Sequence, residues 1–176
     1  RRIETLENEP AFAGRFKIRT VSDLLGGRDL VHDLHKHDFF FVLALQQGSG
    51  HHEIDFADYI IHDHSIFILR PGQVHRLELQ AGCTGFLLEF DASFYHPSDN
   101  KSIQRLNKAT NKNFCELELG SFNKLMAVLT YIFNEYESKQ EGFTEVIRAN
   151  LDIFFIEFIR QSRNQDSASK GRNLYT

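Results

Sequence analysis

The chain has 176 residues, which is enough for one domain of ordinary size or one domain with an appendage. Hydrophobic residues make up 41% of it, and 17 phenylalanines with no tryptophan predict a core rich in phenylalanine rings. The formal net charge of −4 argues against direct binding of nucleic acid by this chain, because such binding needs a basic surface.

The first part of the chain is predicted to form short strands separated by turns. Runs of β-branched and aromatic residues are bounded by turn residues such as Gly26-Gly27 and Pro71-Gly72. Many short strands with regular turns are typical of a β-sandwich or a β-barrel. Strands are predicted at residues 16–21, 39–46, 52–56, 59–61, 65–70, 74–79 and 84–90.

The hydrophobic period changes after residue 100, where helices are expected. A short helix is predicted at residues 102–110, and a longer one follows with Ser121 as a candidate cap. In the longer helix apolar residues recur at positions i, i+3, i+4 and i+7. They are Phe122, Leu125, Met126, Leu129, Ile132, Phe133 and Tyr136.

A further helix, predicted at residues 143–161, is apolar nearly all round and therefore has to be covered on both sides. One cover can be the β-domain or the preceding helix, and the other can be a second copy of the chain. We therefore expect a homodimer. Its predicted interface residues are Ile147, Leu151, Phe154 and Phe158. The alternative is that the preceding helix and the β-domain cover every face within one chain.

The last segment, residues 163–176, is polar and has the composition of a linker. We expect the natural protein to continue beyond it, and a frayed terminus is the alternative. No apolar stretch is long enough to span a bilayer, and the first residues lack the apolar core of a secretory signal. A soluble cytoplasmic protein without a membrane partner is predicted, with Cys83 and Cys115 as free buried thiols.

Several of the nine histidines are predicted to point into the barrel. His35 and His37 lie two residues apart, so on a strand both face one side, and the same parity continues to Phe39 and Phe41. His75 begins another inward set with Leu77 and Leu79.

The other histidines divide into two groups. His52, with Ile54 and Phe56, is a third candidate inward set. The remaining histidines are expected in loops or at the surface, and they are His32, His51, His62, His64 and His96.

Two interpretations of the inward histidines stay open. His35, His37 and His75 could supply the three ligands of a zinc, iron or nickel site with an open position. Alternatively they could line a metal-free polar pocket with aromatic walls, which we favour because no acid follows on the same face. The chain has no nucleophile elbow, phosphate-binding glycine loop or paired inward carboxylates, so we predict neither an enzyme nor a cofactor.

The stretch HKHDFFFVLALQQGSGHHEIDFADYIIHDHSIFILRPGQVHRLEL, residues 35–79, resembles the N-terminal cupin domain of AraC-type transcriptional regulators. The histidine pair precedes an aromatic strand, and a second aromatic-aliphatic strand runs into PGQVH. The segments IDF and PGQVH resemble most the versions found in Bacteroidetes-type bacteria. The helical part at residues 102–160 is also similar, though less closely.

The resemblance implies a mainly β fold with C-terminal helices. Residues 1–100 would form a cupin-type double-stranded β-helix, or jelly-roll barrel, that senses a ligand. Residues 101–162, with two or three helices, would form the dimerisation element. Residues 163–176 would lead to a helix-turn-helix DNA-binding domain outside this chain, so DNA would be contacted only through that domain.

The resemblance also implies a small-molecule effector in the barrel. Its binding residues would be His35, His37, Phe39, Phe41 and His75. A pocket of aromatic and imidazole groups suits a sugar or an aromatic acid. Residues 1–14 are a candidate for the segment that effector binding orders, as an arm does in the arabinose-responsive member of the family.

The chain departs from the metal-binding cupins at one position. Those proteins carry a glutamate about four or five residues after the histidine pair, where this chain has Phe41 and Val42. The departure fits the regulators, whose cupins generally bind an effector and no catalytic metal. Two alternatives remain, a metal-dependent isomerase or dioxygenase using His35, His37 and His75, and a barrel filled by its own phenylalanines.

Overall fold

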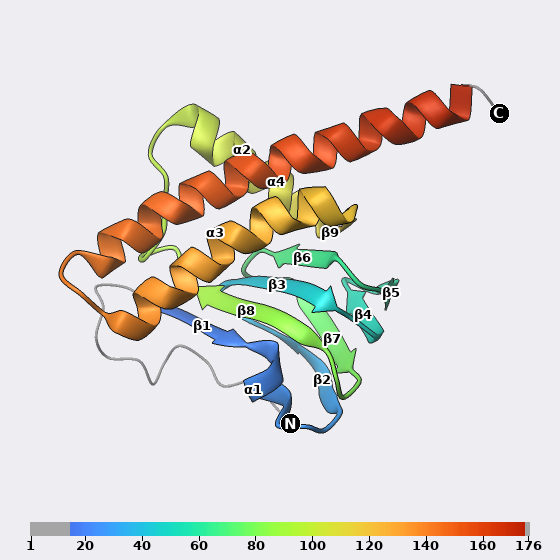
Figure 1. Ribbon diagram of the computed structural model, residues 1–176, viewed down its shortest axis with the longest axis horizontal. Coiled ribbons are helices and arrows are strands. Elements are labelled where there is room, and N and C mark those ends of the chain that lie inside the picture. Colours follow the sequence, from blue (N-terminus) through green and yellow to red (C-terminus); the bar gives the residue numbers. More distant parts are fainter. Residues whose placement is uncertain (1–14, 175–176) are drawn as a thin grey trace.

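The computed structural model describes residues 15–174 and, for side chains, residues 15–165. Two β-sheets face each other, and helices cover the outer side of one of them (Figure 1). The strands are β1 (Phe16–Thr20), β2 (Leu30–Lys36), β3 (Phe40–Gln47), β4 (Gly50–Ile54), β5 (Ala57–Ile61), β6 (Ser65–Leu69), β7 (Val74–Leu79), β8 (Thr84–Phe90) and β9 (Phe114–Glu116). The helices are α1 (Val21–Leu25), α2 (Asn100–Lys112), α3 (Leu119–Ser138) and α4 (Phe143–Leu174).

The strands pair antiparallel in both sheets. The five-stranded sheet has the order β1-β8-β3-β6-β9, and the four-stranded sheet has the order β2-β7-β4-β5. Consecutive strands repeatedly cross between the sheets, as in a jelly roll. The predicted fold class, a jelly-roll barrel followed by helices, is confirmed.

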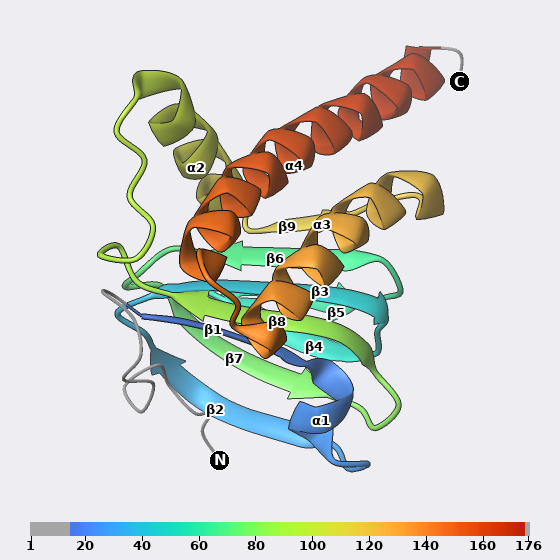
Figure 2. The same ribbon diagram turned by 60° about the vertical axis from the view of Figure 1, so that its left-hand side comes forward.

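The central strand β3 is buried on both faces. Its inward residues Phe41 and Leu43 belong to the core between the sheets. Its outward residues Val42 and Ala44 belong to a second core, between the five-stranded sheet and the helices. Figure 2 shows α3 and α4 lying over the outer face of this sheet. A strand covered on both sides is expected to be a continuous apolar run, as FFVLAL is.

The face of α4 that was predicted to pair two chains is buried within one chain. Ile147, Leu151, Phe154 and Phe158 are all at most 1% exposed and lie in the core beneath the helices. These four residues therefore do not form a free surface, and their assignment to a dimer interface is corrected. The alternative stated above, in which the preceding helix and the β-domain cover this face, accounts for them.

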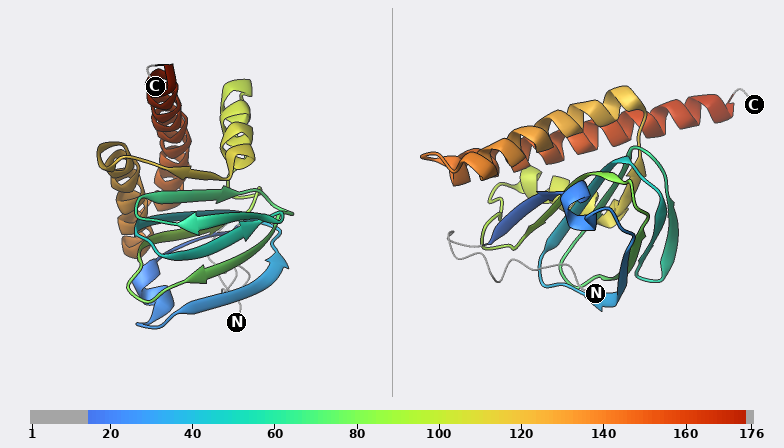
Figure 3. Two further views of the ribbon diagram at one scale, coloured as in Figure 1. Left: turned by 90° about the vertical axis from the view of Figure 1, so that its right-hand side faces the viewer. Right: turned by 60° about the horizontal axis from the view of Figure 1, so that its bottom comes forward.

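Helix α4 is longer than its apolar pattern. It continues through residues 163–174, which were predicted as a linker, while residues 175–176 lie outside the described part (Figure 3). The segment contains alanine, glutamine, lysine and arginine, which are good helix formers, and no proline. Its one glycine, Gly171, costs about 1 kcal/mol relative to alanine. A helix already started by packing can therefore continue through it.

Three short elements were not predicted. In α1, the Thr20 side chain accepts a hydrogen bond from the Asp23 backbone N–H, and Gly26 ends the helix with φ 58°. β2 contains mostly polar residues, and β9 has only three residues, so neither gives a clear hydrophobic period. These two strands form because they pair with neighbouring strands, and their own sequences do not indicate them.

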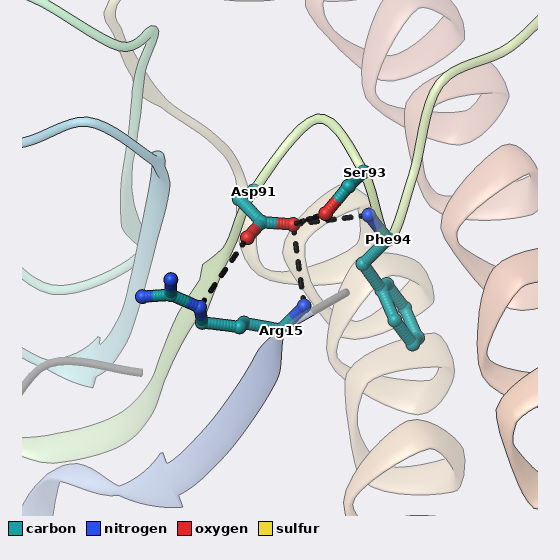
Figure 4. A network of polar contacts seen from close by, with 4 residues as sticks. All are labelled: Arg15, Asp91, Ser93 and Phe94. Carbon is teal, nitrogen blue, oxygen red and sulfur yellow. Dashed lines mark hydrogen bonds and ion pairs between the residues drawn. The ribbon is translucent and has the colours of Figure 1, made fainter. Parts of the chain in front are cut away.

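Polar contacts join the first strand to the end of β8 (Figure 4). Asp91 Oδ1 accepts hydrogen bonds from the backbone N–H of Arg15 at 3.2 Å, from that of Phe94 at 3.0 Å and from Ser93 Oγ at 2.7 Å. Its Oδ2 lies 3.8 Å from Arg15 Nε.

Other sequence predictions can be compared directly. Cys83 and Cys115 are free and buried, as expected. Among the described residues no helix is both long and apolar enough to cross a bilayer.

Candidate functional site

Histidines from three neighbouring strands meet inside the barrel. β2 supplies His32 and His35, the turn after it His37, β4 His52, and β7 His75. Three of them, His32, His52 and His75, are fully buried, His37 is nearly so, and His35 is half-buried at the rim. We call these five residues the histidine cluster.

A bulge allows two histidines of β2 to enter the cluster. His32 and His35 are three residues apart, and on a regular strand they would face opposite sides. The pairing of β2 with β7 shifts register between them, so His32 pairs with Leu77 and His35 pairs with His75. This shift turns both rings toward the interior.

Ring nitrogens of neighbouring histidines lie at hydrogen-bond distance from one another. His37 Nε2 lies 2.9 Å from His35 Nε2 and 2.9 Å from His75 Nε2. On its other side, His75 Nδ1 lies 2.8 Å from His52 Nε2. The backbone carbonyl of Asp33 accepts a hydrogen bond from His35 Nδ1 at 2.6 Å, which fixes the orientation of that ring.

Phenylalanine rings surround the cluster. The ring centroid of Phe41 lies 4.9 Å from that of His75, and Phe67 lies 4.5 Å from His52. The ring of Phe39 is 4.4 Å from that of His37. This environment is apolar and poorly hydrated.

Burial among these rings keeps His52 and His75 uncharged. Burial, and to a smaller extent the positive charge that His32 would carry, lower the pKa of His52 to about 3. Burial also lowers the pKa of His75 strongly, with repulsion from the neighbouring histidines as a smaller cause. Both side chains are therefore neutral imidazoles at pH 7, with lone pairs available to a ligand.

The structure brings together the three histidines that the sequence selected. His35, His37 and His75 are in mutual contact, and Phe41 packs against them. Phe39 differs from the expectation: a bend at residues 38–39 precedes β3, and its side chain joins the outer core while its ring still touches His37.

Two further placements were wrong. His32 was expected at the surface and is instead a buried member of the cluster. Phe56 was expected inside with His52, but it lies in the turn before β5 with φ 69° and is 75% exposed. The bulge in β2 and the early end of β4 explain the errors, because both interrupt strand parity.

One inward residue was overlooked altogether. Glu89 on β8 pairs with Phe41 on β3 and with Lys17 on β1, so it shares the inner face with Phe41. Its side chain is 1% exposed, and neither carboxylate oxygen has a hydrogen-bond partner. Burial raises its pKa to about 8, against the smaller opposite effect of Arg19 and Lys17. The alternation of Leu87 and Glu89 was the signal that could have found it.

We expect Glu89→Gln to stabilise the chain at pH 8. The unfolded chain ionises Glu89 above pH 4.5, whereas the folded chain keeps its proton up to about pH 8, so wild-type stability falls as pH rises between these values. The variant should gain about 2 to 4 kcal/mol at pH 8 and almost nothing at pH 4, measured by urea unfolding. Glu78→Gln, at an exposed position of β7, is the control. Equal effects at both pH values would contradict the prediction.

Comparison with known proteins connects this site to a family. Residues 25–113, half of the chain, match the family model described as AraC-like ligand binding domain. The chain belongs to this family. The matched region of the AraC-like ligand-binding domain contains the whole histidine cluster. No curated protein matches the chain.

Solved structures agree with the fold. The AraC-like domain resembles apo ToxT K231A from Vibrio cholerae with a TM-score of 0.51 and 15% identity, over 90% of this chain and 58% of that one. It is similar to the AraC-like transcriptional activator CuxR with a TM-score of 0.45 and 13% identity, over 68% and 43% of the two chains. A cupin protein from Bacteroides fragilis matches with a TM-score of 0.37 and 17% identity, over 53% and 80%. The chain thus spans about half the length of the two regulators.

Proposed function

We propose that this chain is the effector-sensing part of an AraC-type transcription regulator. The observation that carries the proposal is the histidine cluster inside a barrel of the AraC-like ligand-binding family. Five histidines gather there among aromatic rings, and a few polar groups in an aromatic lining are typical of sites that bind small molecules. The function is binding and signalling rather than catalysis.

The proposed effector site comprises His35, His37, Phe39, Phe41 and His75. His35 at the rim is half-buried, so it is the cluster member that an arriving molecule meets first. Imidazole nitrogens can hydrogen-bond hydroxyl or carboxylate groups, and phenylalanine rings can stack on a sugar or an aromatic acid. These two classes are the proposed effectors.

Signalling requires that effector binding favour one conformation over another. Residues 1–14, proposed as the responding segment, lie outside the described residues. In the proposed assembly, two chains pair through their helical parts, by surfaces other than the buried face of α4. A DNA-binding domain outside this chain contacts DNA, and the protein acts in the cytoplasm.

A thermal-shift screen of sugars and aromatic acids tests the proposal. The screen is run with a chelator, so that metal ions do not contribute. We expect at least one compound to raise the melting temperature by mass action, and its effect should be lost in His35→Gln. The control His51→Gln changes an exposed histidine on the outer side of β4 and should keep the effect. A compound that stabilises both variants equally would place the effector elsewhere.

A further inference from the structure

Glu89 on β8 is a buried acid whose hydrogen-bonding groups are unused. Its side chain is 1% exposed, and within the described part of the chain neither carboxyl oxygen has a hydrogen-bond partner. A buried polar group without a partner destabilises the folded state, because it has lost its hydrogen bonds to water and makes none in the protein. Residues that lower stability in this way are found mainly at functional sites, where a ligand can supply the missing partners.

Glu89 adjoins the proposed effector site without belonging to it. It is the β8 partner of Phe41, and directly opposite residues on one sheet face have Cβ atoms about 5 Å apart. On the facing sheet, the ring centroid of His75 lies 4.9 Å from that of Phe41. A molecule bound against the Phe41 ring can therefore contact the imidazole nitrogens and the Glu89 carboxyl group at the same time.

The groups that surround Glu89 leave it neutral and within reach of a ligand. Lys17 is its partner on β1, and Arg19 lies two residues further on the same face. Both are partly exposed, and β1 is the edge strand of its sheet, so the inner face can be entered from this edge. Burial raises the pKa of Glu89 to about 8, against the smaller opposite effect of these two cations. At pH 7 the carboxyl group is therefore protonated, with one O–H donor and its remaining acceptor positions.

We propose that Glu89 determines the specificity of the effector site by binding two adjacent hydroxyl groups of a sugar or another polyol. This role rests on the proposed function, and it selects one of the two effector classes named there. Of two adjacent hydroxyl groups, one accepts the carboxyl proton and the other donates to the carbonyl oxygen. An aromatic acid would instead bury its carboxylate next to Glu89, and a charge is costly to bury in this apolar lining.

Two substitutions at Glu89 test this role. Glu89→Met keeps the length of the side chain and removes both hydrogen-bonding groups, whereas Glu89→Gln keeps a donor and an acceptor. Both remove the buried ionisable group, so both variants should fold, and thermal melts without ligand establish this. Glu78→Met, at an exposed position of β7, is the matched control.

Binding is measured by calorimetry at pH 7 in chelator. The probes are pentoses, hexoses and their alditols, with benzoate and salicylate as aromatic acids. We expect a sugar or an alditol to bind the parent chain, and Glu89→Met should weaken this binding at least about tenfold, as the loss of two hydrogen bonds predicts. Glu89→Gln should bind more tightly than Glu89→Met, and Glu78→Met should bind as the parent does.

Monodeoxy analogues of the best ligand locate the contact. An analogue that lacks a hydroxyl group bound by Glu89 should lose affinity for the parent chain but not for Glu89→Met, because the two changes remove the same interaction. The role of Glu89 is overturned, and the proposed function kept, if only aromatic acids bind. The same holds if Glu89→Met binds a sugar as tightly as the parent or as Glu89→Gln does. If no compound of either class binds the parent chain, both are overturned.

Discussion

Phe154→Ala should lower the free energy of unfolding by about 3 to 5 kcal/mol, which is enough to unfold a marginally stable domain. Phe154 is a residue of α4, and its ring is fully buried in the core between the helices and the five-stranded sheet. It packs against Phe155 and Phe158. Its removal leaves a cavity that close-packed neighbours cannot fill. Urea unfolding at two protein concentrations measures the effect.

The concentration dependence separates two roles of this helix face. If Phe154 stabilises a single chain, the loss of stability is the same at both concentrations. If it were part of a dimer seam, dilution would destabilise the parent chain and the variant would remain a folded monomer. Ile153→Ala is the matched control. Ile153 immediately precedes Phe154 in α4 and is 45% exposed, so we expect a loss below about 1 kcal/mol.

Acid should destabilise the chain through the histidine cluster. Burial holds the pKa of His52 near 3 and lowers that of His75, whereas both titrate near 6.5 in the unfolded chain. Below pH 6.5 the unfolded state therefore binds protons that the folded state does not, and stability is lost as pH falls. Glu89 acts in the opposite direction between pH 8 and pH 4.5. We expect maximal stability near pH 6.5 and a net loss of about 3 to 4 kcal/mol by pH 4.

Urea midpoints measured in chelator across pH 4 to 8 check this expectation. His52→Gln removes one of the two histidines and halves their joint contribution. Because the opposing effect of Glu89 is unchanged, the net loss by pH 4 should fall to below about 1 kcal/mol. His51→Gln, on the same strand but exposed, should leave the profile as in the parent. A profile that stays flat from pH 6.5 to pH 4 would contradict the inference that His52 and His75 are neutral in the folded chain.

Much of the barrel could be predicted from local pattern because most strands alternate regularly or form continuous apolar runs. The strands from β3 to β8 were found within a few residues. β2 was missed because LVHDLHK is mostly polar, since its inward positions are occupied by histidines. The strand that carries the site was thus hidden by the residues that make the site.

The candidate site was predictable only where strand parity holds. His35 and His37 share a face, and the turn at Pro71-Gly72 places His75 beside them through pairing with β2. The inward position of His32 could be predicted only if the bulge in β2 were known, and no residue of β2 indicates that bulge. The burial of Phe154 within one chain likewise depends on how α4 lies across the sheet. An apolar pattern shows that a helix face is buried, but it does not show which element covers that face.

The wall formed by β3 separates two cores by the thickness of a single strand. Phe41 on one side touches the histidine cluster, and its neighbour Val42 on the other side packs with the helices. Protein interiors are close-packed and transmit displacements. A shift of Phe41 therefore also shifts Val42, against which the helical layer packs. The barrel interior and the helical layer are therefore coupled through β3. A ligand that displaces this strand from inside the barrel would also displace the helices, although it does not contact them.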